Sequence, residues 1–406
     1  MSAIARAVEA RDTVLGVAPR TAVEPASVEE AAEVMRAFAR DRLSVVFVGG
    51  GTDLELGAPP ARLDAVLHTR GMAAIREHAP SDQIVAVQAG MTLAELQRHL
   101  AGHRQRLAID PPFPERATVG GIVAANAFGP RRTRYGPVRD LVIGITVIRA
   151  DGAVARGGGK VVKNVAGFDL PRLYCGSLGT LGLVAEVVFR LHPLPEASAT
   201  ALFEGLDAAD VAETVPVLRD LGVEPTAIAA LPSGGKLALG VRFEGFAPGV
   251  REQVERTLAR AGSGARLEGA EEAALWARHD ATRCAGDVRA KATFAPAGLP
   301  RAAEALAPLA GALRGGALLL HPGPGIAFVS GTLDGAERAA AAVESARAAL
   351  APLGGGALVL SAAPAELRAR TNPWGPPPPA LEVMRRLKQQ LDPEARLAPG
   401  RFVGGI

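Results

Sequence analysis

Short apolar runs alternate with amphipathic helical patterns along the first half of the chain. Between residues 27 and 40, apolar side chains recur at helical spacing behind Ser27, which predicts a helix with a serine N-cap. A second helix is predicted at 93–99. Apolar and β-branched runs predict strands at 43–48, 65–68, 84–87, 141–149 and 184–191. Such a mixture is typical of α/β or α+β folds.

The second half carries the same two patterns with fewer motifs. Helical patterns lie at 211–221, 250–261, 302–313, 337–350 and 381–391. Strand patterns lie at 237–243, 317–321, 326–330 and 357–360. The proline-rich runs at 192–195 and 376–379 favour boundaries there. We therefore expect an N-terminal segment (1–14), a first domain (15–195), an α+β cap region (196–380) and a C-terminal helix and tail (381–406).

Charge and composition narrow the class of protein. The chain has 406 residues, with 45 Lys and Arg against 42 Asp and Glu, and these charges are spread along its length. This balance gives no excess of positive charge that would indicate binding to nucleic acid or to an anionic membrane. No apolar stretch reads as a signal peptide or a transmembrane segment. Cys175 and Cys284 alone cannot build a disulfide framework or hold an iron–sulfur cluster, which favours two reduced thiols in a cytoplasmic protein.

Three consecutive glycines follow directly after the strand predicted at 43–48. Gly49, Gly50 and Gly51 would bring bare backbone N–H groups close to a ligand, and phosphate oxygens fit such a concavity. Thr52 and Asp53 add polar side chains. The lysine of a P-loop and the third glycine of a dinucleotide fingerprint are both missing. From these residues alone, a tight turn without a ligand is as good an interpretation.

The other motifs are ambiguous or incomplete. Gly120 and Gly121 suit either a flat ligand lying against the backbone or close helix packing. The run 157–160 lacks features of a P-loop, and 176–179 lacks one glycine of a nucleophile elbow. The arginines at 131–134 favour a solvated loop over a pyrophosphate or acidic-partner site. His99 and His103 read as two surface histidines, and no metal-ligand cluster is predicted.

Taken in order, the glycine motifs resemble a known family. The segments 49–53, 118–121 and 176–182 are similar to FAD-linked oxidases with a PCMH-type (vanillyl-alcohol-oxidase-like) FAD domain. Further segments resemble the FAD-binding (E) subunits of bacterial glycolate oxidases; they are 129–132, 138–140, 162–170, 387–393 and 399–401. The resemblance implies an α+β fold: a two-part FAD-binding domain, a smaller α+β cap, and a C-terminal helix returning to the FAD domain.

The resemblance also implies roles for particular residues. The FAD pyrophosphate would lie on the first glycine turn, the second motif would run past the flavin and pyrophosphate, and the third would approach the adenine and ribose. The implied cofactor-binding residues are Gly49, Gly50, Gly51, Thr52, Asp53, Thr118, Gly120, Gly121, Gly182 and Val184. Some relatives tether flavin through a histidine in the first loop. Residues 49–53 contain none, so we expect non-covalent FAD.

The function implied by the resemblance is that of one subunit in a complex oxidising glycolate to glyoxylate. Its partners would be a second FAD-linked oxidase subunit and an iron–sulfur subunit, in the cytoplasm or held by partners at the inner face of the membrane. The chain lacks a His-rich motif between 196 and 380, and Leu178 and Ala398 replace residues common in relatives. Two alternatives therefore stay open: a stand-alone FAD oxidase or dehydrogenase of another small alcohol or hydroxy acid, and a non-catalytic assembly subunit.

No catalytic residue is assigned from the sequence, and no metal is expected. Lys163 or Arg139 near the flavin could stabilise its reduced, anionic form, which is a hypothesis only. The role of Cys175 is open.

Overall fold

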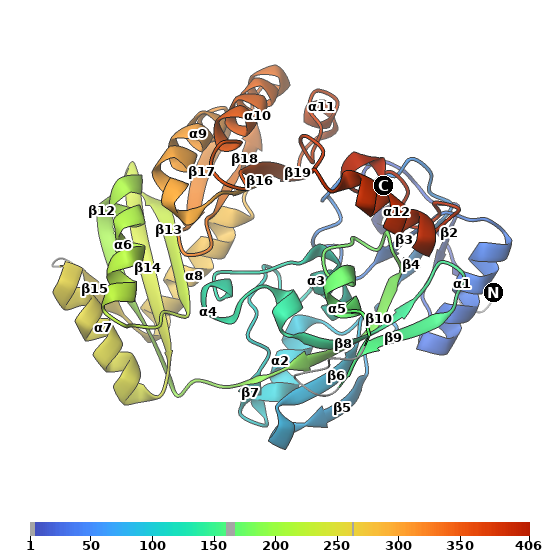
Figure 1. Ribbon diagram of the computed structural model, residues 1–406, viewed down its shortest axis with the longest axis horizontal. Helices are drawn as coiled ribbons and strands as arrows, with labels where there is room; N and C mark the ends of the chain where they lie inside the picture. Colours follow the sequence, from blue (N-terminus) through green and yellow to red (C-terminus); the bar gives the residue numbers. More distant parts are fainter. Residues whose placement is uncertain (1–4, 160–166, 262–263) are drawn as a thin grey trace. The chain divides into compact units, whose positions relative to one another are not determined.

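The computed structural model describes residues 5–159, 167–261 and 264–406 (Figure 1). The chain divides into two compact units. The first consists of Met1–Gly129, Gly136–Leu194 and Pro377–Ile406, and the second of Pro130–Tyr135 and Pro195–Pro376. Both units mix helices and sheets, which confirms the expected α+β class.

One sheet of the first unit carries the first glycine turn. Its strand order is β1-β2-β4-β3, and β2, β4 and β3 run parallel. The strands are β1 (Ala5–Arg6), β2 (Thr21–Val23), β3 (Val45–Val48) and β4 (Ala65–His68). Helix α1 (Val28–Arg40) begins behind Ser27, whose Oγ accepts from the Glu30 amide at 3.1 Å, and its apolar stripe joins the core of this sheet.

The second sheet of this unit is antiparallel, with the order β5-β6-β10-β8-β9. Its strands are β5 (Ile75–Ala79), β6 (Ile84–Gln88), β8 (Val142–Ile148), β9 (Val154–Gly158) and β10 (Leu183–Arg190). A two-stranded ribbon joins β7 (Gln105–Arg106) to β11 (His192–Pro193). The helices are α2 (Leu93–Ala101), α3 (Val119–Ala125) and α5 (Leu170–Tyr174). Side chains of α2, α3, β6, β8 and β10 share one apolar core.

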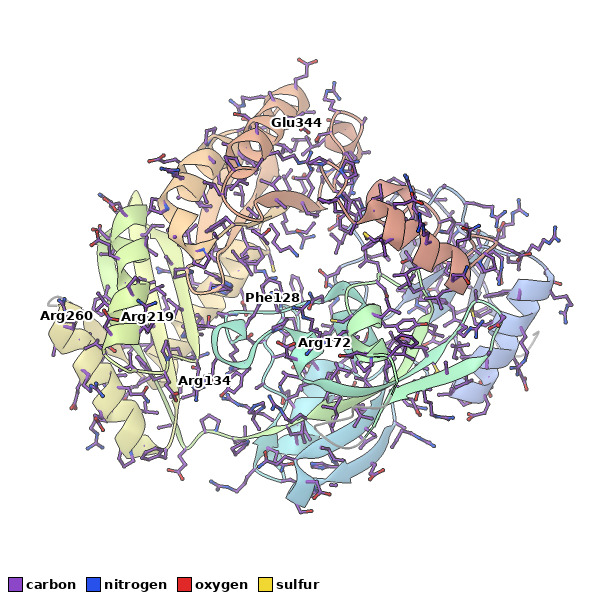
Figure 2. All side chains as sticks on the ribbon, viewed as in Figure 1. Phe128, Arg134, Arg172, Arg219, Arg260 and Glu344 are labelled. Atoms are coloured by element: carbon purple, nitrogen blue, oxygen red, sulfur yellow. The ribbon has the colours of Figure 1, made fainter. Side chains whose placement is uncertain are left out.

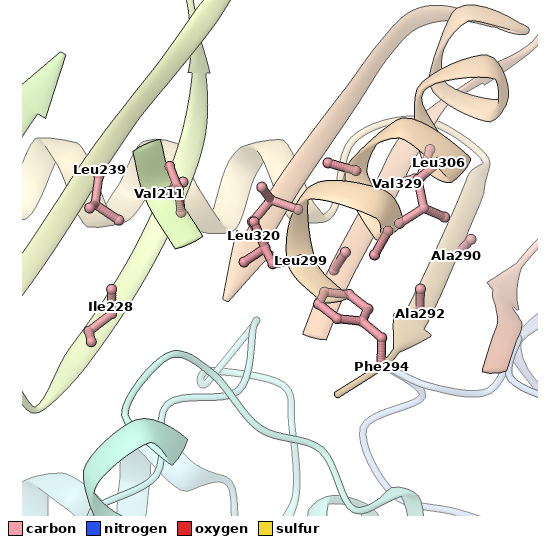
Figure 3. Close-up of a cluster of buried hydrophobic side chains, with 14 of the residues drawn as sticks. Val211, Ile228, Leu239, Ala290, Ala292, Phe294, Leu299, Leu306, Leu320 and Val329 are labelled. Atoms are coloured by element: carbon pink, nitrogen blue, oxygen red, sulfur yellow. The ribbon is translucent and has the colours of Figure 1, made fainter. Parts of the chain in front are cut away.

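The second unit is built on an eight-stranded sheet of order β15-β12-β14-β13-β17-β18-β16-β19. The strands are β12 (Ala197–Leu206), β13 (Ala227–Ser233), β14 (Lys236–Gly245), β15 (Ala265–Leu267), β16 (Val288–Thr293), β17 (Leu313–His321), β18 (Ile326–Leu333) and β19 (Ala357–Ala362). The helices are α4 (Arg132–Tyr135), α6 (Ala208–Asp220), α7 (Ala247–Ala261), α8 (Gly269–Arg283), α9 (Leu299–Gly311), α10 (Ala336–Leu350) and α11 (Ala365–Arg368). Leu299, Leu306 and Val329 lie in the core where α9 covers the sheet (Figure 3).

The last segment of the chain completes the first unit. Helix α12 (Leu381–Leu391) is followed by residues that pair with β3: the Val45 amide donates to the Arg396 carbonyl and the Ala398 amide to the Val45 carbonyl, both at 2.8 Å. Leu397 is fully buried in the core around α1. Short 3-10 helices lie at Ala10–Asp12, Pro80–Asp82, Val138–Asp140, Pro296–Gly298 and Val403–Gly405.

Elements with their own periodicity are found close to their expected places, but several others were missed. Missed elements include α3, α8, β5, β12, β13 and β16. The expectation of a solvated loop at 131–134 is wrong. Residues 132–135 form helix α4, and Arg131, just before it, pairs with buried Glu244 at 2.8 Å. Arg134 (labelled in Figure 2) pairs with Glu224 at 2.7 Å. Within the described ranges, no helix is both long and apolar enough to cross a membrane.

Candidate functional site

One cavity of the first unit gathers all the residues that the glycine motifs suggested. It lies where β3 ends, α3 begins and the chain enters β10, and it contains about 760 Å³ of space free of protein atoms, part of it open to solvent. The expected residues on its wall are Gly49, Gly50, Gly51, Thr52, Asp53, Thr118, Gly120, Gly121, Gly182 and Val184. The three motifs, far apart in sequence, thus form a single site.

The first glycine turn supplies backbone donors to this cavity. Gly51 has a φ of 71°, a left-handed conformation that favours glycine. A Cβ on Gly50 would lie 1.7 Å from the Arg116 carbonyl oxygen, so only glycine allows this close approach of backbones. Within the described part of the chain, the amides of Gly50, Gly51 and Thr52 have no hydrogen-bond acceptor. Unsatisfied amides in a concave turn are suited to bind an anion.

The second glycine motif works differently, because its amides are already used. Thr118 caps helix α3, and its Oγ1 accepts from the Gly121 amide at 3.3 Å. The Gly120 amide donates to the Ala89 carbonyl at 2.8 Å, and a Cβ there would lie 2.6 Å from the Ala89 Cβ. This motif therefore supplies a flat wall of backbone and small side chains, with Ala124 and Ala125 continuing it.

The third motif is a turn that is hydrogen-bonded to α3. The Gly176 amide donates to the Val123 carbonyl and the Leu178 amide to the Ala124 carbonyl, both at 2.9 Å. Leu178 has a φ of 51° and lies on the cavity wall. These bonds fix the turn before β10 against the second motif.

Arg401 is a cavity residue that the sequence did not assign to the site. Its Nη2 donates to the carbonyls of Leu54 and Leu56, at 2.8 and 2.9 Å, and the residue is only 3% exposed. A buried guanidinium beside the first glycine turn adds positive charge where the free amides lie. The Pro-Gly-Arg sequence at 399–401 was the available signal, but nothing in it indicated a place in this cavity.

A buried charge network lies at the end of β4, next to the cavity residue Thr69. The carboxylate of Asp12 accepts from Arg6 at 2.6 Å and lies 2.6 Å from His68 Nε2. Burial raises the pKa of Asp12, but hydrogen bonds from Arg6, the Glu9 amide and His68 outweigh it and lower the pKa well below its usual range. Asp12 is therefore charged at neutral pH and ties the N-terminal segment to β4.

The other residues that the sequence analysis discussed as candidates do not line this cavity or are not among the residues that the structure describes. Lys163 falls outside the described residues, and the Arg139 side chain is half exposed, with Asp140 at 3.8 Å. Cys175 Sγ lies 3.6 Å from Asn126 Oδ1, and neither described cysteine is in a disulfide.

The histidines are less scattered than the sequence suggested. The sequence predicted that no histidines cluster as metal ligands do, and this prediction is wrong. His78 on β5 lies close to His99 and His103, and one ligand atom from each of the three lies within 4.8 Å of the others. In the second unit, buried His279 and His321 face each other with their Nε2 atoms 2.8 Å apart. Burial lowers the pKa of His321 well below its ordinary value, and neighbouring positive groups add to this.

Comparison with known proteins identifies the unit that holds the cavity. Residues 19–158 match the protein family described as FAD binding domain. This part of the chain is therefore an FAD-binding domain. Its cofactor is FAD.

Relatives of the FAD-binding domain carry several names. Glycolate oxidase subunit GlcD of Bacillus subtilis is 32% identical over 59% of this chain and 54% of its own length. Glycolate oxidase subunit GlcE of Escherichia coli is 35% identical over 50% of this chain and 57% of its own. D-lactate dehydrogenase of Archaeoglobus fulgidus is 38% identical over 44% and 41%. The chain spans about half the length of the curated relatives it matches.

Solved structures show the same fold across both units. Alkyldihydroxyacetonephosphate synthase gives a TM-score of 0.71 at 19% identity, covering 94% of this chain and 76% of that one. Chitooligosaccharide oxidase gives 0.66 at 13% identity, covering 93% and 90%. At these identities the likeness concerns the fold alone.

The residues of the cavity fit FAD. A diphosphate needs hydrogen-bond donors and positive charge, which the amides of the first glycine turn and Arg401 provide. A flat ring system needs a wall without bulky side chains, which α3 provides through its glycines and alanines. The assignment of each residue to a part of the cofactor, and its non-covalent attachment, stay predictions.

Proposed function

We propose that the chain is the FAD-binding subunit of a complex that oxidises a small 2-hydroxy acid, glycolate, to the 2-oxo acid glyoxylate. The single observation that carries this proposal is the cavity with free amides and a buried arginine in the FAD-binding domain. Relatives named as glycolate oxidase subunits and D-lactate dehydrogenases support a hydroxy acid as the substrate class.

The oxidation removes two electrons and two protons from the substrate. The C2–H bond breaks with transfer of a hydride, the hydroxyl gives up its proton, and a C=O double bond forms. Bound FAD accepts a hydride and can release single electrons. The amides of Gly50, Gly51 and Thr52 with Arg401 would hold the diphosphate, and α3 would keep the adjoining wall flat. No residue of this chain is assigned as the proton acceptor.

We further propose that the chain works with partners. The relatives include both GlcD and GlcE, which supports a complex in which a second FAD-linked oxidase subunit takes part in hydride removal. An iron–sulfur subunit would then accept the electrons one at a time. Such a complex would work in the cytoplasm or at the inner face of the membrane, where partners would hold it.

Anaerobic flavin reduction tests the proposal. The chain is purified alone and together with the two candidate partner subunits, and glycolate or D-lactate is added while the flavin absorbance is followed. We expect FAD that is released by acid, and bleaching by glycolate in the complex. A purified chain with no flavin absorbance after incubation with FAD would overturn the cofactor assignment.

The same experiment separates the alternatives. Bleaching of the isolated chain by D-lactate would favour a stand-alone dehydrogenase, an alternative that the relative from Archaeoglobus fulgidus supports. Full activity of a complex whose copy of this chain cannot bind FAD would favour an assembly role. Either result would contradict the proposal of glycolate oxidation that depends on this subunit's flavin.

A further inference from the structure

Three histidines from two segments of the first unit lie close together, and none of them lines the FAD cavity. His78 lies on β5, His99 in the last turn of α2, and His103 just after that helix. The His78 ring centroid lies 5.1 Å from that of His99 and 4.7 Å from that of His103. His99 and His103 are exposed and His78 is half-buried, so the cluster is open to solvent.

Gln105 determines which nitrogen of His78 carries the proton. Gln105 Nε2 donates to the Pro80 carbonyl at 2.7 Å, which turns Gln105 Oε1 towards His78 Nε2 at 2.9 Å. An amide oxygen only accepts, so His78 Nε2 carries the hydrogen. The lone pair of His78 then lies on Nδ1, which faces His99 Nε2 at 3.1 Å.

This arrangement is typical of a histidine that binds a metal. Metal-bound histidines commonly donate their other ring N–H to an oxygen that fixes the tautomer and the ring orientation. Two nitrogens bound to one tetrahedral metal at about 2.0–2.1 Å lie about 3.3 Å apart. The 3.1 Å between His78 Nδ1 and His99 Nε2 is close to this separation, and a small rotation of exposed His103 would bring in a third nitrogen.

We propose that His78, His99 and His103 bind a divalent transition-metal ion such as Zn²⁺. Three imidazoles would occupy three positions, and water would fill the remainder because the cluster is open. Imidazole ligands suit zinc, copper and nickel ions rather than magnesium or calcium. Strand β5 is the edge strand of its sheet, so a bound ion would tie this edge to the C-terminal end of α2.

Zinc binding by the untagged, FAD-loaded protein tests the proposal. After treatment with a chelator, Zn²⁺ is titrated in a calorimeter, and the melting temperature is measured with and without Zn²⁺. We expect about one equivalent to bind and the melting temperature to rise. In His103→Ala and His99→Ala the affinity should fall about tenfold or more. Arg98→Ala, on the same helix with its side chain 70% exposed, is the matched control and should bind as the wild type does.

Two outcomes would overturn the proposal. One is that the wild type and the double variant His99→Ala, His103→Ala bind Zn²⁺ equally, which would place the ion elsewhere, for example at a cysteine. The other is that the wild type binds no Zn²⁺ at all. Flavin absorbance of each variant reports whether it is folded, and His103→Asn replaces any alanine variant that fails to load FAD. Neither outcome depends on turnover of a hydroxy acid.

Discussion

At the scale of single residues, the glycines of the cavity have different functions. Gly121 is the one whose substitution is expected to alter FAD binding without disturbing the fold. A Cβ on Gly50 would collide with backbone, whereas one on Gly121 meets only Thr118 Oγ1, at 3.2 Å. Gly121→Val should therefore leave the fold intact while adding bulk to the cavity wall. We expect FAD affinity to fall about tenfold, a change of about 1.4 kcal/mol in binding free energy.

Fluorescence titration with FAD measures this effect. Gly311→Val is the matched control, because Gly311 ends helix α9 of the second unit and a Cβ there meets nothing within 4 Å. It should bind FAD as the wild type does. Equal affinity in Gly121→Val and the wild type would place the cofactor away from this wall.

A second residue-scale prediction concerns pH. Glu95 accepts from the hydroxyl and amide of Thr92, and with help from Arg70 this lowers its pKa to about 2. The unfolded chain protonates Glu95 at a higher pH, so the carboxylate stabilises the fold above its ordinary pKa. This contribution is lost as the pH falls towards about 2. We expect the unfolding free energy of Glu95→Gln to depend less on pH than that of the wild type.

Urea unfolding at several pH values between about 5 and 3 measures that dependence. The control is Glu115→Gln, whose side chain is 77% exposed and whose carboxylate lies 3.9 Å from Arg98 Nη2. Its pH profile should match that of the wild type. A Glu95→Gln profile as steep as the wild type's would show that the capping box around Thr92 does not contribute.

At the scale of elements, helix α12 is held to the first unit by one buried lysine. Lys388 Nζ donates to the carbonyls of Thr180 and Leu397 and to Asp392 Oδ2, at 2.9, 2.8 and 2.7 Å. Asp392 is 1% exposed, so Lys388→Met would leave its charge buried without this cation. We expect the unfolding free energy to fall by about 3 kcal/mol.

Chemical unfolding followed by flavin fluorescence and circular dichroism checks this value. Arg386→Met, on the same helix with its side chain 75% exposed, should change the unfolding free energy by less than about 0.5 kcal/mol. A similar loss in both variants would mean that the helix is held by its general charge and not by the Lys388 contacts.

The elements also show what the sequence could and could not predict. Helices α1 and α12 were predicted because each carries its own amphipathic pattern. Strand β5 was missed because its sequence, Ile-Arg-Glu-His-Ala, is mostly polar and it pairs on one side only. Helix α3 was missed because two glycines begin a run of small residues, and its position depends on the Thr118 cap and contacts with Ala89.

The residues of the candidate site also fall into those that the sequence could predict and those that it could not. The order of the glycine motifs indicated ten cavity residues through their resemblance to a family, and all ten line one cavity. Arg401 and the grouping of His78 with His99 and His103 depend on contacts between distant segments, which no local pattern records. Cavity residues in continuous glycine motifs could thus be predicted. Arg401, which reaches the cavity only because the C-terminal segment folds back onto the first unit, could not.

At the scale of the whole molecule, the first unit is discontinuous, because the chain leaves it after Leu194 and re-enters at Pro377. The returning segment supplies the bonds of Arg396 and Ala398 to β3, the buried side chain of Leu397, and Arg401 in the cavity. A chain ending at Pro376 keeps every residue of the second unit and loses all of these. We expect it to retain no FAD after gel filtration, as measured by flavin absorbance.

The truncated chain would lack both the packing of the last segment on β3 and the Arg401 side chain in the cavity. The substitution Arg401→Met separates these two causes of FAD loss. It keeps the pairing of Ala398 with β3 and the burial of Leu397, but removes the guanidinium that is bonded to the Leu54 and Leu56 carbonyls in the cavity wall. We expect this variant to fold and to bind FAD about tenfold more weakly, since charge-assisted hydrogen bonds are among the stronger contacts to a diphosphate. Stoichiometric FAD in the truncated chain would show that the first unit is complete without its last segment. Unchanged affinity in Arg401→Met alone would limit that segment to a structural role.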